Sequence, residues 1–271
     1  GRPVLAVSTA ASSLATYRPR GLRWCTAASL LLGAYGSLML GDTGSATRDA
    51  TEAAGILTPL GDAWGLVHAE AMLGGIAEAE HRFDDAAPAL RRAAEESARL
   101  GFLGQAALHR ATLARVQHRM RDPQAAGSYL QAIGEAVASG DGRLAATARL
   151  NLARLRRDVD DSEARALLEE NERWYASAGG GEFAQLTHCL LAAVHDDASE
   201  LETVLEEARV SNNVEVQVCA LDALARLAAQ AGDSGSARTL LSEADSLALQ
   251  VAHVLDEDDR LDGSRARQLL S

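Results

Sequence analysis

The fold is decided by the stretch DAWGLVHAEAMLGGIAEAEHRFDDAAPALRRAAEESARLG, residues 62–101. Its second half carries Ala86, Leu90 and Ala93, spaced four and three residues apart. This spacing places the three side chains on one stripe of an α-helix, with alanine where a neighbouring helix comes close and leucine where space must be filled. A second apolar helix fits before the turn at Arg82. The stretch therefore predicts a helical hairpin, whose first and second helices we call A and B.

The same stripe recurs in six successive segments of the chain, each counted from a turn that is acidic except at Arg82. The turns are at Asp42, Arg82, Asp122, Asp160, Asp197 and Asp233. Four residues after them stand Ala46, Ala86, Ala126, Ala164, Leu201 and Ala237, and eight after them Ala50, Leu90, Leu130, Leu168, Leu205 and Leu241. Eleven after them stand Ala53, Ala93, Ile133, Asn171, Ala208 and Ala244. The chain is therefore an array of hairpins.

The ends of the B helices are marked by residues that accept the left-handed conformation of a helix C-cap. They are Gly61, Gly101, Gly140, Gly179 and Asn212. Between each of them and the next turn there is room for one helix A. These limits give units that start near residues 21, 62, 102, 141, 182 and 213.

The second unit resembles the tetratricopeptide consensus, with Leu73-Gly74 in helix A, Phe83 in the turn and Ala86, Leu90 and Ala93 in helix B. The first and sixth units carry Leu32-Gly33 and Leu224-Ala225 at the places of Leu73-Gly74. The resemblance implies an all-α fold, a right-handed α-α superhelix or solenoid of about six helical hairpins, each slightly longer than the ~34 residues of a standard unit. A HEAT-like helical array is the alternative.

The domain boundaries follow from the repeat. Residues 1–20 are expected to be a remnant of a preceding helix or a cut edge, residues 21–255 the repeat domain, and residues 256–271 a segment that caps the stack with a short helix after an acidic run. The fifth unit is the least regular, with a short helix A, and the glycines at 179–181 before it are expected to form a flexible joint.

The composition limits the function. A net charge of −12 repels a phosphate backbone, so we expect no direct nucleic-acid binding. The chain has no lysine, which excludes a P-loop lysine, a Schiff base and a polybasic membrane patch. The most apolar run, residues 27–40, is shorter than the ~20 residues that span a bilayer, so we expect a buried helix and no contact with a membrane. The three cysteines lack metal spacing and are expected to be buried thiols in a reducing cytosol, so we expect a cytoplasmic protein.

Several short motifs resemble active sites, and we interpret them structurally. GDTGSA from Gly41 and GDSGS from Gly232 resemble protease motifs, but both fall at an A-to-B turn, where glycine ends one helix and aspartate caps the next. His68-Ala69-Glu70 lacks the cysteines of a zinc deaminase. His188, Cys189 and His195 would be the candidates if a metal were bound, and the acidic run at 256–259 lacks an EF-hand pattern. We therefore expect no enzyme activity, metal or cofactor.

The segments LGDAWGLVHAEAMLGGIAEAEHRFDDAAPAL and GDSGSARTLLSEADSLALQVAHVLDEDDRLD resemble the C-terminal repeat regions of AfsR/SARP-type transcriptional regulators of actinobacteria. This resemblance implies a non-catalytic interaction or sensor domain of a bacterial regulator, whose partner is a protein or peptide, another domain of the same regulator, or an effector. A stand-alone adaptor for peptides and a MalT- or LuxR-type small-molecule sensor are the alternatives, and a homodimer stays open.

In tetratricopeptide arrays helix A lines the concave groove, and the repeat register transfers its inward positions to this chain. The candidate groove residues are Tyr35, Leu38, His68, Glu78, Arg115, His118, Arg119, Arg149, Arg156, Arg157, Asp222 and Arg226. The middle of the groove would be rich in arginine, so that an acidic peptide or another domain would dock there through its carboxylates. The alternative is that these arginines pair with neighbouring acids or are only solvated.

Overall fold

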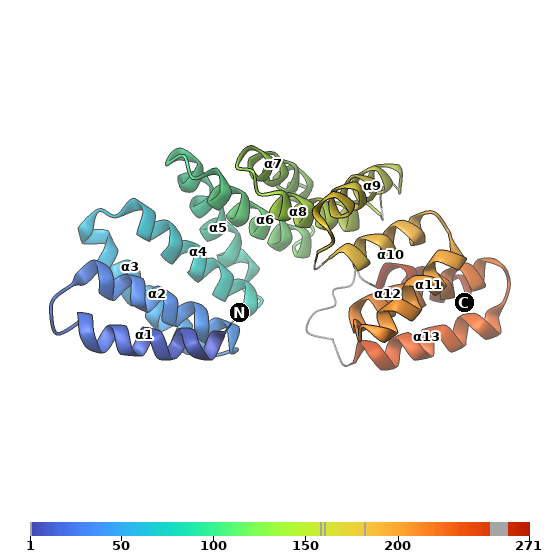
Figure 1. Ribbon diagram of the computed structural model, residues 1–271, viewed down its shortest axis with the longest axis horizontal. Coiled ribbons are helices and arrows are strands. Elements are labelled where there is room, and N and C mark those ends of the chain that lie inside the picture. The colour runs from blue at the N-terminus through green and yellow to red at the C-terminus, as the bar shows by residue number, and fades with distance from the viewer. Residues whose placement is uncertain (1, 158, 160, 182, 250–259) are drawn as a thin grey trace. The chain divides into compact units, whose positions relative to one another are not determined.

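Every regular element in the described part of the chain is a helix. The computed structural model describes residues 2–157, 159, 161–181, 183–249 and 260–271, and within these ranges it contains α-helices and one 3₁₀ helix but no strand. The chain forms two compact units, Gly1–Ala145 and Ala146–Ser271. Figure 1 shows the helices in chain order.

The first unit is a series of consecutive hairpins. Its helices are α1 (Pro3–Tyr17), α2 (Arg23–Met39), α3 (Thr43–Leu57), η1 (Thr58–Leu60), α4 (Ala63–Ala79), α5 (Phe83–Arg99), α6 (Leu103–Arg119) and α7 (Ala125–Ala138), followed by the start of α8 (Gly142–Arg156). Consecutive α-helices pack on each other from α1 through α7, and in addition α2 contacts α4 and α4 contacts α6. The A helices α2, α4 and α6 therefore lie side by side (Figure 1).

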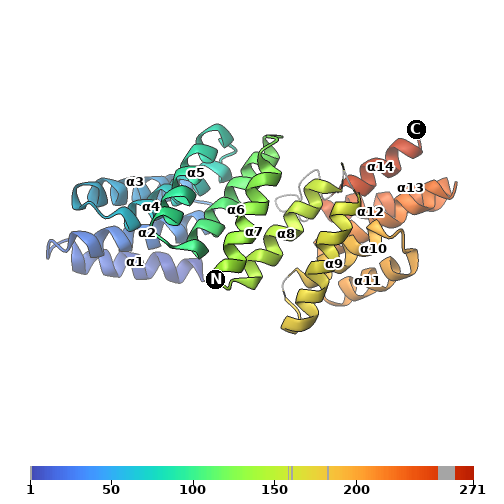
Figure 2. The same cartoon turned by 90° about the horizontal axis from the view of Figure 1, so that it is seen from above.

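The second unit continues the pattern with the rest of α8 and with α9 (Asp161–Ala178), α10 (Ala184–Val194), α11 (Ala198–Val210), α12 (Val214–Gln230), α13 (Ser234–Ala248) and α14 (Leu261–Leu269). The A helices α10 and α12 contact each other, as in the first unit. Helix α10 is the shortest A helix, as the sequence predicts for the fifth hairpin repeat. The last helix, α14, packs against α12 (Figure 2). The acidic run at 256–259, which was expected to begin a segment capping the stack, lies outside the described residues.

The turns between helices have the geometry that the sequence predicts. All five predicted C-cap residues have positive φ, from 54° at Asn212 to 83° at Gly101. Asp42 and Asp233 cap the following helices by accepting hydrogen bonds from the backbone N–H groups of Ser45 and Ser236. The two protease-like motifs are therefore helix caps, while Asp160 lies outside the described residues.

The predicted stripe is buried in five of the six hairpin repeats counted from the sequence, and the third repeat departs from it. Leu130 is 52% exposed and Ala126 is only half-buried, whereas the preceding residues Ala125 and Tyr129 are buried. The turn at Asp122 differs from the others, because α7 begins three residues after it, at Ala125, whereas the other B helices begin at the residue directly after the turn. The side chain of Asp122 likewise accepts from residue 124 and not from residue 125. The buried side of this helix is therefore shifted by one residue along the sequence. The prediction that Ala126, Leu130 and Ile133 form its buried stripe is wrong by one residue.

No helix in the described ranges is long and apolar enough to cross a membrane. The apolar run at 27–40 forms most of α2 and its C-cap, and Ala27, Leu30 and Ala34 are buried against neighbouring helices. The three cysteines differ, because Cys189 and Cys219 are buried while Cys25 is only half-buried.

The shifted register of α7 can be tested by truncating two adjacent side chains. Tyr129→Ala should lower the free energy of unfolding by roughly 3–5 kcal/mol, because it removes a buried aromatic ring. Leu130→Ala should change it by less than about 0.5 kcal/mol, because this side chain is mostly in solvent. Urea unfolding followed by circular dichroism measures both free energies. If Leu130→Ala lowers the free energy of unfolding more than Tyr129→Ala does, the register predicted from the sequence is the correct one.

Candidate functional site

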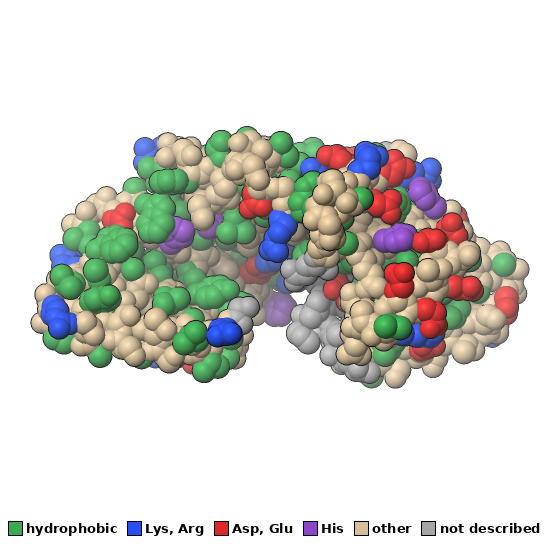
Figure 3. Space-filling model, viewed as in Figure 1, with side chains coloured by type: hydrophobic (Ala, Val, Ile, Leu, Met, Phe, Trp, Pro, Cys, Tyr) green, Lys and Arg blue, Asp and Glu red, His purple; other side chains and the backbone are tan. Residues whose placement is uncertain are grey.

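The exposed side of the A helices in the first unit carries aromatic and aliphatic side chains. We call this surface the unit 1 A face and define it by Trp24 and Tyr35 of α2, Trp64 of α4, and Leu108 and Arg115 of α6, all of which are exposed. Trp24 and Trp64 are each the second residue of their helices, and the indole N–H of Trp24 donates to Asp62, which caps α4. Figure 3 shows that hydrophobic side chains are widespread over this unit.

One charged pair connects two helices of the unit 1 A face. Both oxygens of Glu78 on α4 accept hydrogen bonds from Arg115 on α6, at 2.7 and 2.9 Å. The Glu78 side chain is 9% exposed, whereas that of Arg115 is 48% exposed. Arg119 is also exposed, and Leu38 and His118 are half-buried. The guanidinium groups of Arg115 and Arg119 therefore reach the surface beside the aromatic residues.

A pair of histidines lies beneath this surface. The ring of His68 packs edge-on against Trp64, with centroids 4.2 Å apart, and lies 6.3 Å from the ring of His109. Within the described residues, neither Nε2 atom has a hydrogen-bond partner. Burial lowers the pKa of both rings, and the charge on His68 adds to the effect at His109, whose pKa falls to about 4. Both rings are therefore neutral at pH 7.

His109 was not among the residues proposed from the sequence. It is the seventh residue of α6, and the seventh residues of α2 and α4 are the buried Ser29 and Ala69. The only feature of the sequence that could have indicated a buried histidine here is that the equivalent positions of other A helices hold small residues.

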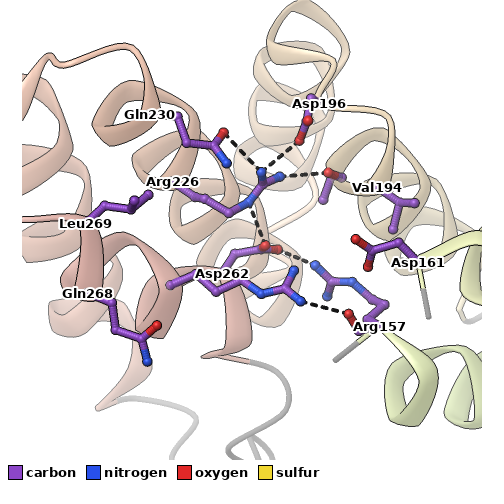
Figure 4. A pocket seen from close by; sticks show the side chains of 11 residues that line it. Arg157, Asp161, Val194, Asp196, Arg226, Gln230, Asp262, Gln268 and Leu269 are labelled. Carbon is purple, nitrogen blue, oxygen red and sulfur yellow. Dashed lines mark hydrogen bonds and ion pairs between the residues drawn. The ribbon is translucent and has the colours of Figure 1, made fainter. Parts of the chain in front are cut away.

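The second unit brings together arginines and aspartates at a cavity of about 430 Å³ (Figure 4). Arg157, which follows α8, and Arg226 on α12 both bind the carboxylate of Asp262 on α14. Arg226 also donates to the carbonyl oxygen of Ala193 and pairs with Asp196. The side chains of Arg157 and Asp262 are only 3% and 5% exposed. Burial opposes the charge on Arg157, but Asp262 outweighs this and raises the pKa of the guanidinium.

Two further candidate arginines in the second unit are paired within the chain. Arg149 is buried, donates to Asn171 at 3.0 Å and pairs with Glu170 at 3.0 Å. Asn171 in turn donates to the carbonyl of Ala146, which accounts for an asparagine in a column of alanines. Arg156 pairs with Glu163 at 2.9 Å. The structure thus pairs Arg115, Arg149, Arg156, Arg157 and Arg226 with acids, and their contact with a partner stays a prediction.

The histidines considered for a metal do not converge on Cys189. His188 lies 2.8 Å from a carboxylate oxygen of Glu200 and His195 lies 4.0 Å from one of Glu169, while Cys189 is buried in the hydrophobic core. Burial raises the pKa of the Cys189 and Cys219 thiols, that of Cys219 to about 12. The described residues contain no group of three or more histidine, cysteine or acidic side chains that could hold a metal ion.

No protein-family model matches the chain, and no curated protein matches it in sequence. Solved structures do resemble it. The tetratricopeptide repeat sensor protein of the signal transduction ATPase type from Pyrococcus horikoshii has a TM-score of 0.70 at 14% identity, over 89% of this chain and 39% of that chain. BtubC from P. vanneervenii has a TM-score of 0.60 at 16% identity, over 94% of each chain.

A Rap protein complexed with competence and sporulation factor has a TM-score of 0.63 at 15% identity, over 84% of this chain and 65% of that chain. At these identities the likeness concerns the fold. The chain therefore has an all-α fold of the tetratricopeptide-like superhelical type.

The buried histidines predict a fall in stability on mild acidification. Lowering the pH from about 7.5 to about 5 should reduce the free energy of unfolding by roughly 2 kcal/mol through His109. The unfolded imidazole takes up a proton near its ordinary pKa of 6.5, while the folded ring stays neutral down to about 4, so stability is complete above pH 6.5 and declines below it. Urea unfolding of the wild type and of His109→Gln at both pH values measures the effect. His81→Gln, at an exposed ring, is the control. Equal pH dependence in wild type and His109→Gln would contradict the assignment.

Proposed function

We propose that this chain is a non-catalytic protein-interaction domain that binds a segment of a partner protein on the unit 1 A face. The observation that supports this proposal is the exposure of Trp24, Tyr35 and Trp64 on neighbouring A helices. Large aromatic side chains bury much area for little lost conformational entropy, and they are enriched among the residues that dominate binding energy. Covering these aromatic side chains with a partner would therefore contribute strongly to the binding free energy.

The chemistry of the partner follows from the charged groups beside the aromatic residues. Arg115 holds Glu78 through two hydrogen bonds but keeps about half of its side chain in solvent. Arg119 is exposed one turn further along α6. Guanidinium groups bind carboxylates through paired hydrogen bonds. The segment proposed for this face therefore combines apolar side chains with aspartate or glutamate.

The proposal extends to a role within a cytoplasmic bacterial transcriptional regulator. Two observations support it: the repeat sequence resembles the helical regions of AfsR/SARP-type regulators, and the Pyrococcus horikoshii protein of similar fold carries a tetratricopeptide repeat sensor. The partner would then be another protein or another domain of the regulator. A stand-alone peptide adaptor would use the same surface without that context.

Binding can be tested with a matched set of labelled peptides. Three amphipathic peptides with the same leucine and phenylalanine positions would carry glutamate, serine or lysine elsewhere, and fluorescence polarisation would measure their affinity for the full chain. We expect the glutamate peptide to bind best. Trp64→Ala and Arg115→Glu should each weaken it by about tenfold or more, because they remove an aromatic anchor and reverse a charge.

Arg99→Glu is the matched control, because Arg99 is also exposed and paired with a glutamate but lies on the B helix α5. Its peptide affinity should stay within about twofold of the wild type. Circular dichroism should show the same helicity in all three variants. The proposal fails if no peptide binds, or if Arg99→Glu weakens binding as much as Arg115→Glu does.

A further inference from the structure

Helix α14 occupies the surface of the second unit that corresponds to the unit 1 A face. Arg226 lies twelve residues after the first residue of α12, and Arg115 and Tyr35 lie twelve residues after the first residues of α6 and α2. The three positions are therefore equivalent in the repeat. At this position in the second unit, α14 packs on α12, and its Asp262 binds Arg226 (Figures 2 and 4).

One carboxylate of α14 is held by two arginines from other parts of the second unit. Asp262 accepts from the Nε of Arg226 at 2.8 Å and also binds Arg157. Arg265, one turn further along α14, donates to the carbonyl of Arg157 at 2.8 Å. Because Asp262, Arg157 and Arg226 are all buried, removing the carboxylate would take from both guanidinium groups the buried anion that they share, and of the described acids Arg226 would keep only its pair with the exposed Asp196. Thus the site requires an acid at this point.

Small side chains let α14 approach α12 closely. A Cβ atom on Gly263 would lie less than 3 Å from the carboxylate atoms of Asp222, so any larger residue there requires the buried Asp222 side chain or the helix to shift. Ala266 packs in a cluster with Ala225 and Leu241. Asp262, Gly263 and Ala266 thus form a recognition pattern along one side of α14. A second ion pair, between Arg260 and Asp222, joins the start of α14 to α12.

Helix α14 is short and only partly buried. The helix has nine residues, fewer than an isolated helix needs to be stable in water. Leu269 is 54% exposed, and the cavity beside the helix is lined by Arg265, Gln268 and Leu269 together with Arg157 and Arg226. Since Ala266 is the only apolar side chain of α14 that is fully buried, its docking depends mainly on ion pairs. Asp262 pairs with Arg157 and Arg226, while Arg260 and Arg267 pair with acids of α12 and α13.

We propose that Arg157, Arg226 and the adjoining surface of α12 form a binding site for a helical protein segment that carries an aspartate followed by glycine, and that α14 fills this site within the chain. A partner segment with this pattern and larger side chains toward the cavity displaces α14. The second unit therefore exposes its A face only when α14 leaves. This inference concerns the second unit alone and does not require that the unit 1 A face bind a partner.

The test uses a full-length variant that releases α14 while leaving the site intact. Gly263→Leu places a side chain against Asp222 and should expel the helix, whereas Arg157 and Arg226 stay unchanged. A labelled peptide with the sequence of residues 260–271 should then bind Gly263→Leu at least about tenfold more tightly than the wild type, whose site is filled. A peptide with Asp262→Asn should bind Gly263→Leu at least about tenfold more weakly, and Arg226→Gln in the Gly263→Leu chain should abolish binding.

Gly235→Leu is the matched control, because a Cβ on Gly235 in α13 would make only ordinary contact with Asp233. It should bind the peptide as weakly as the wild type does. If folded Gly263→Leu does not bind the peptide, or binds the Asp262→Asn peptide equally well, the proposal is overturned.

A measurement on the wild type covers the case in which Gly263→Leu does not fold. Hydrogen exchange should show the amides of α14 exchanging at least about tenfold faster than those of α12, because α14 opens separately. Excess unlabelled peptide should accelerate exchange in α14 and not in α12. Equal protection of the two helices would mean that α14 is a fixed part of the unit, and the proposal would fail.

Discussion

The structure depends on the close approach of helices at alanine and glycine. Ala86 and Ala93 have no exposed surface, and a Cβ on Gly74 would lie 2.8 Å from the side chain of Leu90 on the next helix. Such contacts gain dispersion energy over the whole length of two helices and leave no cavity. Because few aromatic side chains fill the interior, each hairpin is stabilised by contact with its neighbours and not by one large core.

This packing decides which side chains are available for binding. Small residues on one side of each helix make the contacts between helices. The opposite side of the A helices takes no part in these contacts, so its side chains are available for binding. In the first unit that side bears Trp24, Tyr35 and Trp64, and in the second unit the equivalent surface is covered by α14. The two units share one backbone plan but present different surfaces, apolar in the first and built around Arg157, Arg226 and Asp262 in the second.

The charge distribution has the same origin. Every side-chain cation apart from histidine is an arginine, and the guanidinium group is suited to ion pairs away from water, because it holds a carboxylate through two parallel hydrogen bonds. The buried acids Glu78 and Asp222 are held in this way by Arg115 and Arg260. The buried Asp262 instead accepts one hydrogen bond from each of two arginines, Arg157 and Arg226. In a chain of net charge −12, arginines on A helices thus connect elements that are distant in sequence and leave the excess of acids on the surface.

The sequence by itself determined the helices, their turns and their hairpin pairing, because these depend on residues that are close along the chain. The spacing of Ala86, Leu90 and Ala93, the left-handed caps such as Gly101, and the aspartates at the turns all act within a few residues. The shifted register of α7 was missed because this helix begins three residues after Asp122 and not directly after it, and every following side chain is rotated accordingly. Only the tertiary structure decided which acid each arginine binds and that α14 lies on α12. Arg157 and Asp262 are 105 residues apart, and no local pattern fixes a contact between charges that meet only after the helices have packed.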